Sequence, residues 1–503
     1  MGLGQLTLII LLIAAALTAF TGFVLKRNEN WLVSYLQHAV GSLFIFSGWV
    51  KVADPMGTGF KMEQYFAEFQ ATFEGTWFSF IAPLFPMMSD YALAFSVVVI
   101  IVEILLGMML ILGMWKKFTA WAFFALIAFF TFLTGFTYLT GYVPSGTNFF
   151  QFAQWGPYNP DNMRVTDCGC FGDFIVIEPK VSFFKDLILM VPAIFFLFSY
   201  NKMHQLFTEK IRHTSVVAAS IILLVYAFSN FAWNLPHIDF RAFHEGADIR
   251  TQLNLERDAA SNVQVVAWEL EDKETGEVIT LSTDDYFANL TEYRETHSVV
   301  RQIQSEPEMQ FTKVSDYMIN HLDGYEVTDE LLDYPGHSIM IVTYSLPGRS
   351  IRETVTVQDT TFIIDSVTTV TEGGVDSTFV IERVDEIIER EDTEITYEWD
   401  ERFNRHFTEK IIPFVNEARA SGVQSYLVSG EANTHKLESF QREMGMEDVE
   451  FYFADDILLK TIIRSSPGVV WWHDGVILKK WHKARLPGFK EVEEDIVADI
   501  GEN

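Results

Sequence analysis

Cysteine is nearly absent from this chain: its 503 residues include only two. Both lie in one short run, Asp167-Cys168-Gly169-Cys170-Phe171-Gly172-Asp173. The nearest histidines, His38 and His204, are too distant in sequence to complete a local Cys/His zinc site. The sequence also contains no Gly-rich phosphate loop, no metal-ligand motif and no Ser/His/Asp constellation. These absences leave the two sulfurs as the chemically distinctive groups of the chain.

The spacing of the cysteines supports two interpretations. In the first, Cys168 and Cys170 form a reversible dithiol/disulfide pair, because Gly169 permits the backbone angles that so small a ring requires. Strained or exposed disulfides tend to be the labile, catalytic ones. In the second, the bridge or the free thiols only stabilise a tight loop. The flanking carboxylates of Asp167 and Asp173 oppose strong activation, because nearby negative charge disfavours a thiolate.

Charge divides the chain into two parts. Residues 1–242 contain 14 acidic and 13 basic residues, whereas residues 243–503 contain 53 acidic and 23 basic residues. Hydrophobic residues make up 49% of the chain, with 45 phenylalanines, which is typical of a protein that lies partly in lipid. The abrupt change in charge between the two parts predicts a domain boundary near 235–245. The net charge of -30 in the second part repels nucleic acid and anionic lipid headgroups, so it predicts a soluble domain.

Several stretches are apolar and long enough to span a bilayer, which requires roughly 20 residues. The first lacks the basic segment and the cleavage site of a signal peptide, so we interpret it as a membrane helix. The predicted fold is therefore an α-helical membrane bundle of about six spans followed by a soluble domain. The predicted spans cover approximately 5–25, 32–52, 91–114, 118–142, 182–200 and 214–233.

Basic residues in the connecting loops predict the orientation of these spans. The N-terminus, the loops at 53–90 and 143–181 and everything after 234 are expected outside the cytoplasm. In a bacterial inner membrane this puts the cysteines and the acidic domain in the periplasm, an oxidising compartment. The basic residues occupy alternate loops, which one topology places in the cytoplasm: Lys26, Arg27, Lys116, Lys117, Lys202, Lys210 and Arg212.

Ionisable residues in or beside the apolar stretches are further candidates. Glu103 lies near the middle of the third stretch. A carboxylate at this depth costs free energy, so such a residue is a functional candidate by default. The alternative is a structural role, either a hydrogen bond to another helix or pairing with Lys51 or Lys185. Polar stripes on the second and fourth stretches are more typical of helix–helix contacts than of ligand binding. Their members are Ser34, His38 and Ser42, and Thr131, Thr134 and Tyr138.

Two sets of residues in this half resemble a known family. The run Phe44-Ile45-Phe46-Ser47-Gly48-Trp49-Val50-Lys51, with Asp54-Pro55 and then Glu103 and Gly107, resembles the DoxX superfamily. The cysteine run, followed by Phe184-Lys185-Asp186, resembles its MauE-type branch, and the likeness covers about 32–200. The resemblance implies a four-helix membrane bundle linked to thiol–disulfide chemistry and to quinone-coupled sulfur oxidation. It implies Cys168 and Cys170 as the redox site, with Glu103, Lys51 and Lys185 as candidates in the bundle interior.

The second half resembles a thioredoxin-like α/β domain from about 323 onward. Ser465-Ser466-Pro467-Gly468 resembles the cis-proline segment of such proteins, and similar tails follow DoxX-type bundles in Bacteroidetes-like sequences. Ser345-Leu346-Pro347-Gly348 stands where a thioredoxin has Cys-x-x-Cys, so this domain cannot exchange disulfides. Strand-like runs at 338–344, 423–428, 451–453, 468–472 and 475–481 alternate with helix-like runs at 403–421, 435–444 and 456–463.

Two further segments are expected to be rich in β-structure. Alternating residues at 350–400 predict an inserted antiparallel ribbon, with Gly373-Gly374 as its turn and a charged strand or helix after 386. The segment 243–322 is predicted to be a partly β annex. The expected organisation is an N-terminal membrane helix at 1–30, a four-helix bundle at 31–200, a last membrane helix and linker at 201–242, the annex, and the thioredoxin-like domain at 323–503.

Two functions fit these patterns. In the first, the protein is a membrane thiol–disulfide oxidoreductase whose Cys168 and Cys170 accept electrons from an exported protein and pass them to a membrane quinone or a partner. In the second, it is a non-enzymatic envelope subunit whose bundle anchors a docking domain for a partner protein. A thioredoxin-like fold without thiols is a common binding module, and an acidic surface offers charge complementarity. The two hypotheses differ in whether the cysteines cycle.

Overall fold

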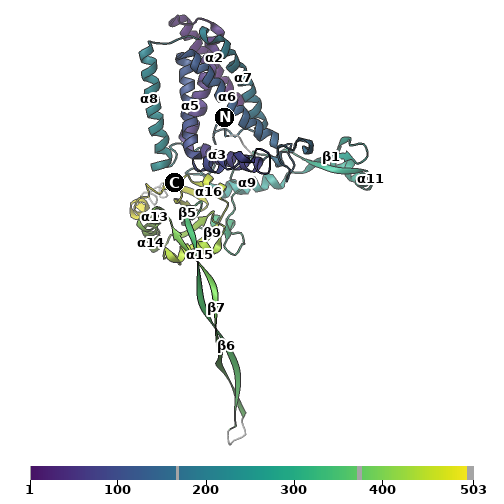
Figure 1. The fold of residues 1–503 in the computed structure, drawn as a ribbon, viewed down its shortest axis with the longest axis vertical. Helices are drawn as coiled ribbons and strands as arrows, with labels where there is room; N and C mark the ends of the chain where they lie inside the picture. The colour runs from purple at the N-terminus through teal and green to yellow at the C-terminus, as the bar shows by residue number, and fades with distance from the viewer. Residues whose placement is uncertain (1, 166–168, 371–375, 495–503) are drawn as a thin grey trace. The chain divides into compact units, whose positions relative to one another are not determined.

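A computed structural model describes residues 2–165, 169–370 and 376–494 (Figure 1). The chain forms two compact units. The first comprises Met1–Tyr317, Lys460–Val470 and Gly475–Arg485, and the second comprises Met318–Leu459, Trp471–Asp474 and Leu486–Asn503. The N-terminal half therefore shares its unit with two short segments from near the C-terminus.

Helices make up most of the first unit. Those from the N-terminal part are α1 (Leu3–Ala19), α2 (Trp31–Ala53), α3 (Pro55–Phe73), α4 (Leu84–Asp90), α5 (Ala92–Leu112), α6 (Lys116–Thr140), α7 (Pro179–Ser199) and α8 (Glu209–Phe228). A π-helical turn extends α1 over Phe20–Val24 and another extends α8 over Ser229–Trp233, and a 3-10 turn at Tyr200–Lys202 follows α7. Shorter 3-10 turns lie at Ser79–Ile81, Phe152–Gln154 and Pro160–Asn162.

Within the described part of the chain, five helices are long and apolar enough to cross a membrane. They are Leu3–Val24, Ala92–Leu112, Lys116–Thr140, Pro179–Lys202 and Glu209–Trp233. The stretch predicted as a sixth span, at 32–52, forms helix α2 but is not among them. Its interior position explains the lower hydropathy, because α2 buries polar side chains that a lipid-facing helix would exclude: Ser34, Gln37, His38 and Lys51.

The segment 53–90, which connects two of the predicted spans, contains the helices α3 and α4. Asp54 caps α3 by accepting a hydrogen bond from the Gly57 amide at 3.2 Å, and Pro55 occupies the first helical position. An aspartate followed by proline is a strong helix-start signal. The pair that begins α3 is the same Asp54-Pro55 that forms part of the family resemblance.

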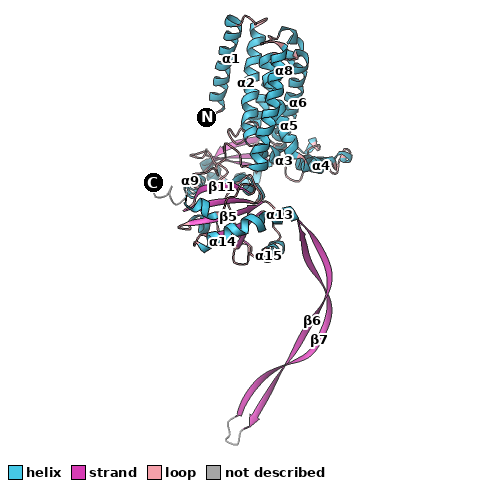
Figure 2. Cartoon of the chain, turned by 90° about the vertical axis from the view of Figure 1, so that its left-hand side faces the viewer, coloured by secondary structure: helices cyan, strands magenta, loops and turns pink. Residues whose placement is uncertain are grey.

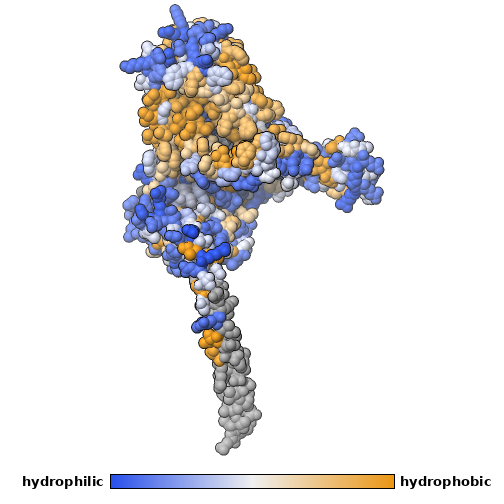
Figure 3. Space-filling model, viewed as in Figure 1, coloured by the Kyte–Doolittle hydropathy of each residue, from blue (hydrophilic) through white to orange (hydrophobic). Residues whose placement is uncertain are grey.

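Small residues allow α2 and α5 to approach each other closely. A Cβ atom at Gly41 would lie 2.8 Å from the Gly107 carbonyl oxygen, and one at Gly107 would lie 2.7 Å from the Gly41 carbonyl oxygen. Glycines at both positions therefore let the two backbones touch, as small residues do in membrane helix pairs. Apolar residues cover much of the visible outer face of the bundle (Figure 3). The exposed apolar side chains of α7 include Ile188, Val191 and Phe198.

The basic loops of the bundle lie at one end. Lys116 at the start of α6 pairs with Glu29 at 3.2 Å and donates to the Asn201 carbonyl at 3.3 Å. The Leu206 amide donates to the Leu112 carbonyl at 3.0 Å. These contacts join the α1–α2, α5–α6 and α7–α8 connections, which carry the lysines and arginines that we used to predict orientation.

A small sheet completes the first unit after the helices. Helix α9 (Ile249–Ser261) precedes strands β1 (Val265–Asp272), β2 (Val278–Ser282) and β3 (His297–Gln304), which pair antiparallel in the order β2-β1-β3. Helices α10 (Thr283–Ala288) and α11 (Leu290–Thr296) connect β2 to β3. This sheet occupies the segment for which we expected a partly β annex.

A six-stranded sheet in the order β11-β10-β5-β8-β9-β4 organises the C-terminal part (Figure 2). Strands β5, β8 and β9 are parallel, and β4 pairs antiparallel with β9. The boundary between the two units passes through α16 and β10. The elements are β4 (Asn320–His321), α12 (Thr328–Leu332), β5 (His337–Thr343), α13 (Glu401–His406), α14 (Ile412–Ala420), β8 (Gln424–Ser429), α15 (Thr434–Glu443), β9 (Glu450–Phe453), α16 (Asp456–Ile462), β10 (Gly468–His473) and β11 (Val476–His482).

A long antiparallel ribbon is inserted between β5 and α13 in the second unit. It consists of β6 (Gly348–Val370) and β7 (Asp376–Trp399), paired from Gly348 opposite Trp399 to Val370 opposite Asp376. The charged stretch after 386 is thus a strand, and the predicted turn at Gly373-Gly374 lies outside the described residues. Trp399 fixes the base of the ribbon, since its indole nitrogen donates to Glu443 at 2.7 Å and its ring lies 5.1 Å from that of Phe440.

Candidate functional site

The cysteine run forms a tight turn before α7. Gly169 and Gly172 have φ angles of +58° and +52°, values that favour glycine, and the Gly172 amide donates to the Gly169 carbonyl at 3.2 Å. Cys170 lies between them and is partly buried. Cys168 and Asp167 lie outside the described residues, so the disulfide between Cys168 and Cys170 stays a prediction.

The bundle holds this turn in place on both sides of Cys170. The Ser47 hydroxyl of α2 donates to the Cys170 carbonyl at 2.8 Å. Phe171 is 2% exposed and packs against Leu6 and Ile10 of α1. A buried aromatic side chain and a backbone hydrogen bond flank the thiol, so its position is set by two helices rather than by the loop alone.

Cys170 lines a cavity that reaches into the bundle. Its walls come from α2, α3, α5, α6 and α7 as well as from the turn, and they are mainly apolar, with several ionisable side chains. The predicted site residues Lys51, Glu103 and Lys185 all line it together with Cys170. The apolar lining includes Leu43, Phe44, Met62, Val99, Ile100, Ile127, Phe130, Leu133 and Leu189.

The charges in this cavity are arranged as pairs. Lys51 Nζ lies 2.7 Å from Glu103 Oε2, so the structure contains one of the structural pairings that we considered for Glu103. Lys185 Nζ lies 2.7 Å from Asp186 Oδ1, and Thr134 donates to Asp186 Oδ2 at 3.0 Å. Pairing lowers the free-energy cost of placing charge at this depth, and four such groups beside a thiol are unusual for a merely structural interior.

Some lining residues were not predicted as site residues. Asp186 appeared only as part of a family motif, although its position next to Lys185 was a usable signal. Lys61 lies on α3, and its Cγ would be 3.4 Å from a Cβ atom placed at Gly169. Lys61 lies more than 100 positions before the cysteines, and no local pattern around it indicates this proximity.

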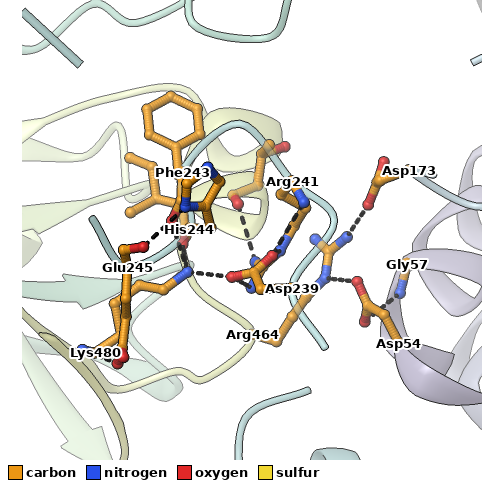
Figure 4. Close-up of polar contacts among 12 residues, drawn as sticks. Asp54, Gly57, Asp173, Asp239, Arg241, Phe243, His244, Glu245, Arg464 and Lys480 are labelled. Atoms are coloured by element: carbon orange, nitrogen blue, oxygen red, sulfur yellow. Dashed lines mark hydrogen bonds and ion pairs between the residues drawn. The ribbon is translucent and has the colours of Figure 1, made fainter. Parts of the chain in front are cut away.

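Asp173, at the end of the cysteine run, is held by an arginine from a distant part of the same unit (Figure 4). Arg464 NH2 lies 3.1 Å from Asp173 Oδ2, and Arg464 Nε lies 2.8 Å from Asp54 Oδ2. The guanidinium also lies over the Phe60 ring of α3, 5.3 Å from its centroid. One cation thus joins the end of α2 to the cysteine turn.

A second buried ion cluster lies beside the first (Figure 4). Arg241 contacts both carboxylate oxygens of Asp239, at 2.7 and 2.8 Å, and the Lys480 ammonium contacts the same carboxylate. Burial alone would raise the pKa of Asp239, but the two cations together hold it well below its ordinary value. The cluster ties the segment after the last membrane helix to β11.

The remaining predicted residues lie outside the cavity lining. The peptide bond between Ser466 and Pro467 is cis, and Lys483 Nζ donates to the Ser466 carbonyl at 2.8 Å. His38 is buried, stacks on the His204 ring at 4.6 Å and contacts the Thr18 hydroxyl of α1 at 3.0 Å. This contact joins α1 to α2, as expected for a polar stripe between helices.

One family model matches this chain. The family is described as methylamine utilisation protein MauE, and the match covers residues 29–146. That range includes α2, α3, α5 and α6, with Lys51 and Glu103, and ends before the cysteine turn and Lys185. Together with the five apolar helices, the similarity indicates a multi-pass membrane protein. No curated protein and no solved structure matches the chain.

Proposed function

We propose that this chain is a thiol–disulfide oxidoreductase of the inner membrane, related to the DoxX superfamily, with a thioredoxin-like domain in the periplasm. Cys168 and Cys170 form its redox pair. The observation that carries the proposal is the position of Cys170, which lines an apolar cavity together with the pairs Lys51–Glu103 and Lys185–Asp186. If Cys170 only stabilised the turn, a cavity lined by its thiol and by two ion pairs would not be required.

The chemistry is an exchange of two electrons and two protons. A substrate thiolate attacks the Cys168–Cys170 disulfide and forms a mixed disulfide, and the second substrate thiol then releases the cysteine pair. The substrate gains a disulfide, and Cys168 and Cys170 become a dithiol. Regenerating their disulfide removes two electrons and two protons. Two carboxylates, those of Glu103 and Asp186, line the cavity beside the turn that carries Cys170.

The acceptor that fits the cavity is a quinone. The walls formed by Phe44, Ile100 and Phe130 suit an apolar ring, and the ammonium groups of Lys51 and Lys185 are donors suited to its carbonyl oxygens. When bound, a quinone supplies a two-electron, two-proton acceptor, which is the stoichiometry that the dithiol requires. These residues would hold the ring next to the turn that carries Cys170.

Counting accessible thiols tests this function directly. In the purified full chain, a mass-tagged maleimide is expected to add nothing before mild reduction and two tags after it. Incubating the reduced protein with a fully substituted benzoquinone, which cannot add to thiols, should remove both reactive thiols, and fresh reductant should restore them. Cys168→Ser is the control, because one thiol should then stay reactive throughout. Two free thiols under oxidising conditions, or no response to quinone and no mixed disulfide with any dithiol substrate, would reject the oxidoreductase.

A second candidate function rests on the C-terminal region. Residues 243–503 contain no cysteine and carry a net charge of -30, and the second unit bears the β6–β7 ribbon. A domain of this kind suits binding of a partner protein in the envelope rather than catalysis. If the cysteines never cycle, the bundle is best explained as the membrane anchor of that docking domain.

A further inference from the structure

We propose that Arg464 is a positioning residue for Cys170: it holds the Asp173 carboxylate and offsets its negative charge, so that the thiolate of Cys170 is available. The inference deepens the proposed function and rests on Cys170 being a reactive thiol. It also answers a difficulty in the sequence, where acidic residues flank the cysteines and oppose thiolate formation.

The geometry assigns this role to one guanidinium. Arg464 contacts Asp54 and Asp173 through different nitrogens, at 2.8 and 3.1 Å, and its own side chain is 5% exposed. Asp54 caps α3 and Asp173 closes the cysteine turn, so the arginine links the turn to a fixed helix end. A planar fork with several donors can make both contacts at once, whereas a lysine offers a single charged point.

The backbone that carries Arg464 is itself held in place. Arg241 NH1 donates to the Thr461 carbonyl at 2.9 Å, and Lys480 Nζ donates to the Ile462 carbonyl at 3.2 Å. Both cations belong to the buried cluster around Asp239 (Figure 4). The cluster therefore fixes the segment just before Arg464. A fixed backbone preorganises the guanidinium charge near the Cys170 turn.

Other charges near Cys170 come from other elements of the unit. The pairs Lys51–Glu103 and Lys185–Asp186 line the cavity from α2, α5 and α7, and Lys61 faces the turn from α3. Each of these groups belongs to an element other than the α16–β10 connection that carries Arg464. A change at Arg464 thus alters the charge beside Asp173 while the cavity pairs stay in place.

The test measures the reactivity of the Cys170 thiol in the full chain, in a Cys168→Ser background. Only the thiolate reacts with iodoacetamide, so the alkylation rate at neutral pH reports the thiolate fraction. Arg464→Gln is expected to slow alkylation by about two- to tenfold, the effect of one charge at several ångströms in a partly solvated site. Adding Asp173→Asn should restore the rate. Arg485→Gln, an exposed arginine of the same unit, removes the same charge and should change nothing.

Each result decides the question. An unchanged rate in Arg464→Gln overturns the proposal, and so does a slowed rate that Asp173→Asn fails to restore, because loss of structure alone would not be cured by removing a carboxylate. If Arg464→Gln does not fold, Asp173→Asn by itself should speed alkylation, and no change would overturn the proposal. The assay involves no turnover, so it succeeds or fails independently of whether Cys168 and Cys170 cycle.

Discussion

Lys51 and Glu103 form an ion pair across the contact between α2 and α5, with 2.7 Å between Nζ and Oε2 and with side chains that are 7% and 3% exposed. The backbones of the same two helices are in close contact at Gly41 and Gly107. Close backbone packing on one part of the interface and a buried charge pair on another fix the two helices against each other. The pair also lines the cavity beside Cys170, so it serves the architecture and the site together.

Breaking this pair is expected to destabilise the bundle. Glu103→Gln leaves a buried ammonium without its counterion, which lowers the free energy of unfolding by about 3–5 kcal/mol. Replacing both partners by methionine should recover most of that stability but abolish any response of the thiols to quinone. Thermal unfolding in detergent measures the first effect. Glu29→Gln, which removes an exposed pair with Lys116, is the control and should cost less than about 1 kcal/mol. Equal effects of Glu29→Gln and Glu103→Gln would contradict the prediction.

The orientation of the chain can be tested with single cysteines. In a background of Cys168→Ser with Cys170→Ser, we expect a membrane-impermeant maleimide to label Ser421→Cys in intact spheroplasts but not Lys117→Cys. Both positions are exposed in the structure, so burial does not decide the outcome. Lysis should make Lys117→Cys reactive. The reverse pattern would place the cysteine turn in a reducing compartment and remove the basis for a stable disulfide.

Local patterns in the sequence predicted most elements but not the contacts between distant segments. The helix at Pro179–Ser199 and the strand at His337–Thr343 follow from apolar runs, and Glu103 was a candidate because a carboxylate in an apolar helix is conspicuous. Arg464 gave no such signal. Its partner Asp54 lies 410 positions away, and nothing in the residues around either one indicates the other. Long-range pairing of this kind depends on how the whole unit folds, which periodicity does not encode.

The lowered pKa of Asp239 predicts how its contribution to the free energy of unfolding changes with pH. Because its folded-state pKa lies below the ordinary value, the stabilisation is fully present above the unfolded pKa of about 4 and is lost as pH falls through the folded value. Asp239→Asn should lower the free energy of unfolding by about 3–5 kcal/mol. The difference in Tm between this variant and the wild type should not narrow as pH falls from 7 to 5, and it should narrow below about pH 4. Asp258→Asn, an exposed carboxylate of α9, is the control. A gap that already narrows between pH 7 and pH 5 would refute the assignment.

The last prediction concerns the β6–β7 ribbon, which we expect to bind a basic partner protein through its acidic strand. The register suggests how to shorten it, because Arg352 pairs with Ile395. Replacing residues 353–394 by Asn-Gly, a favoured two-residue hairpin turn, keeps Gly348 and the buried Trp399 at the base. The otherwise complete chain with the shortened ribbon should therefore keep the Tm of the wild type but no longer recover the partner protein in a pull-down. A matched variant keeps the ribbon but removes charge, with glutamine or asparagine at Glu386, Glu389, Glu391 and Asp392.

The salt dependence of this experiment shows whether the partner binds through the acidic side chains or through other features of the ribbon. Contacts between exposed charges weaken as the Debye length falls from about 8 Å at physiological ionic strength to about 3 Å at 1 M salt. The amount of partner protein that the wild type recovers in the pull-down should therefore drop at high salt. At low salt, the charge-removal variant should recover as little partner as the wild type does at high salt. If the shortened chain recovers the partner as well as the wild type does, the binding surface lies elsewhere in the acidic half. If recovery by the wild type is insensitive to salt, the acidic residues of β7 do not determine binding, and the unpaired edges of the ribbon become the better candidate.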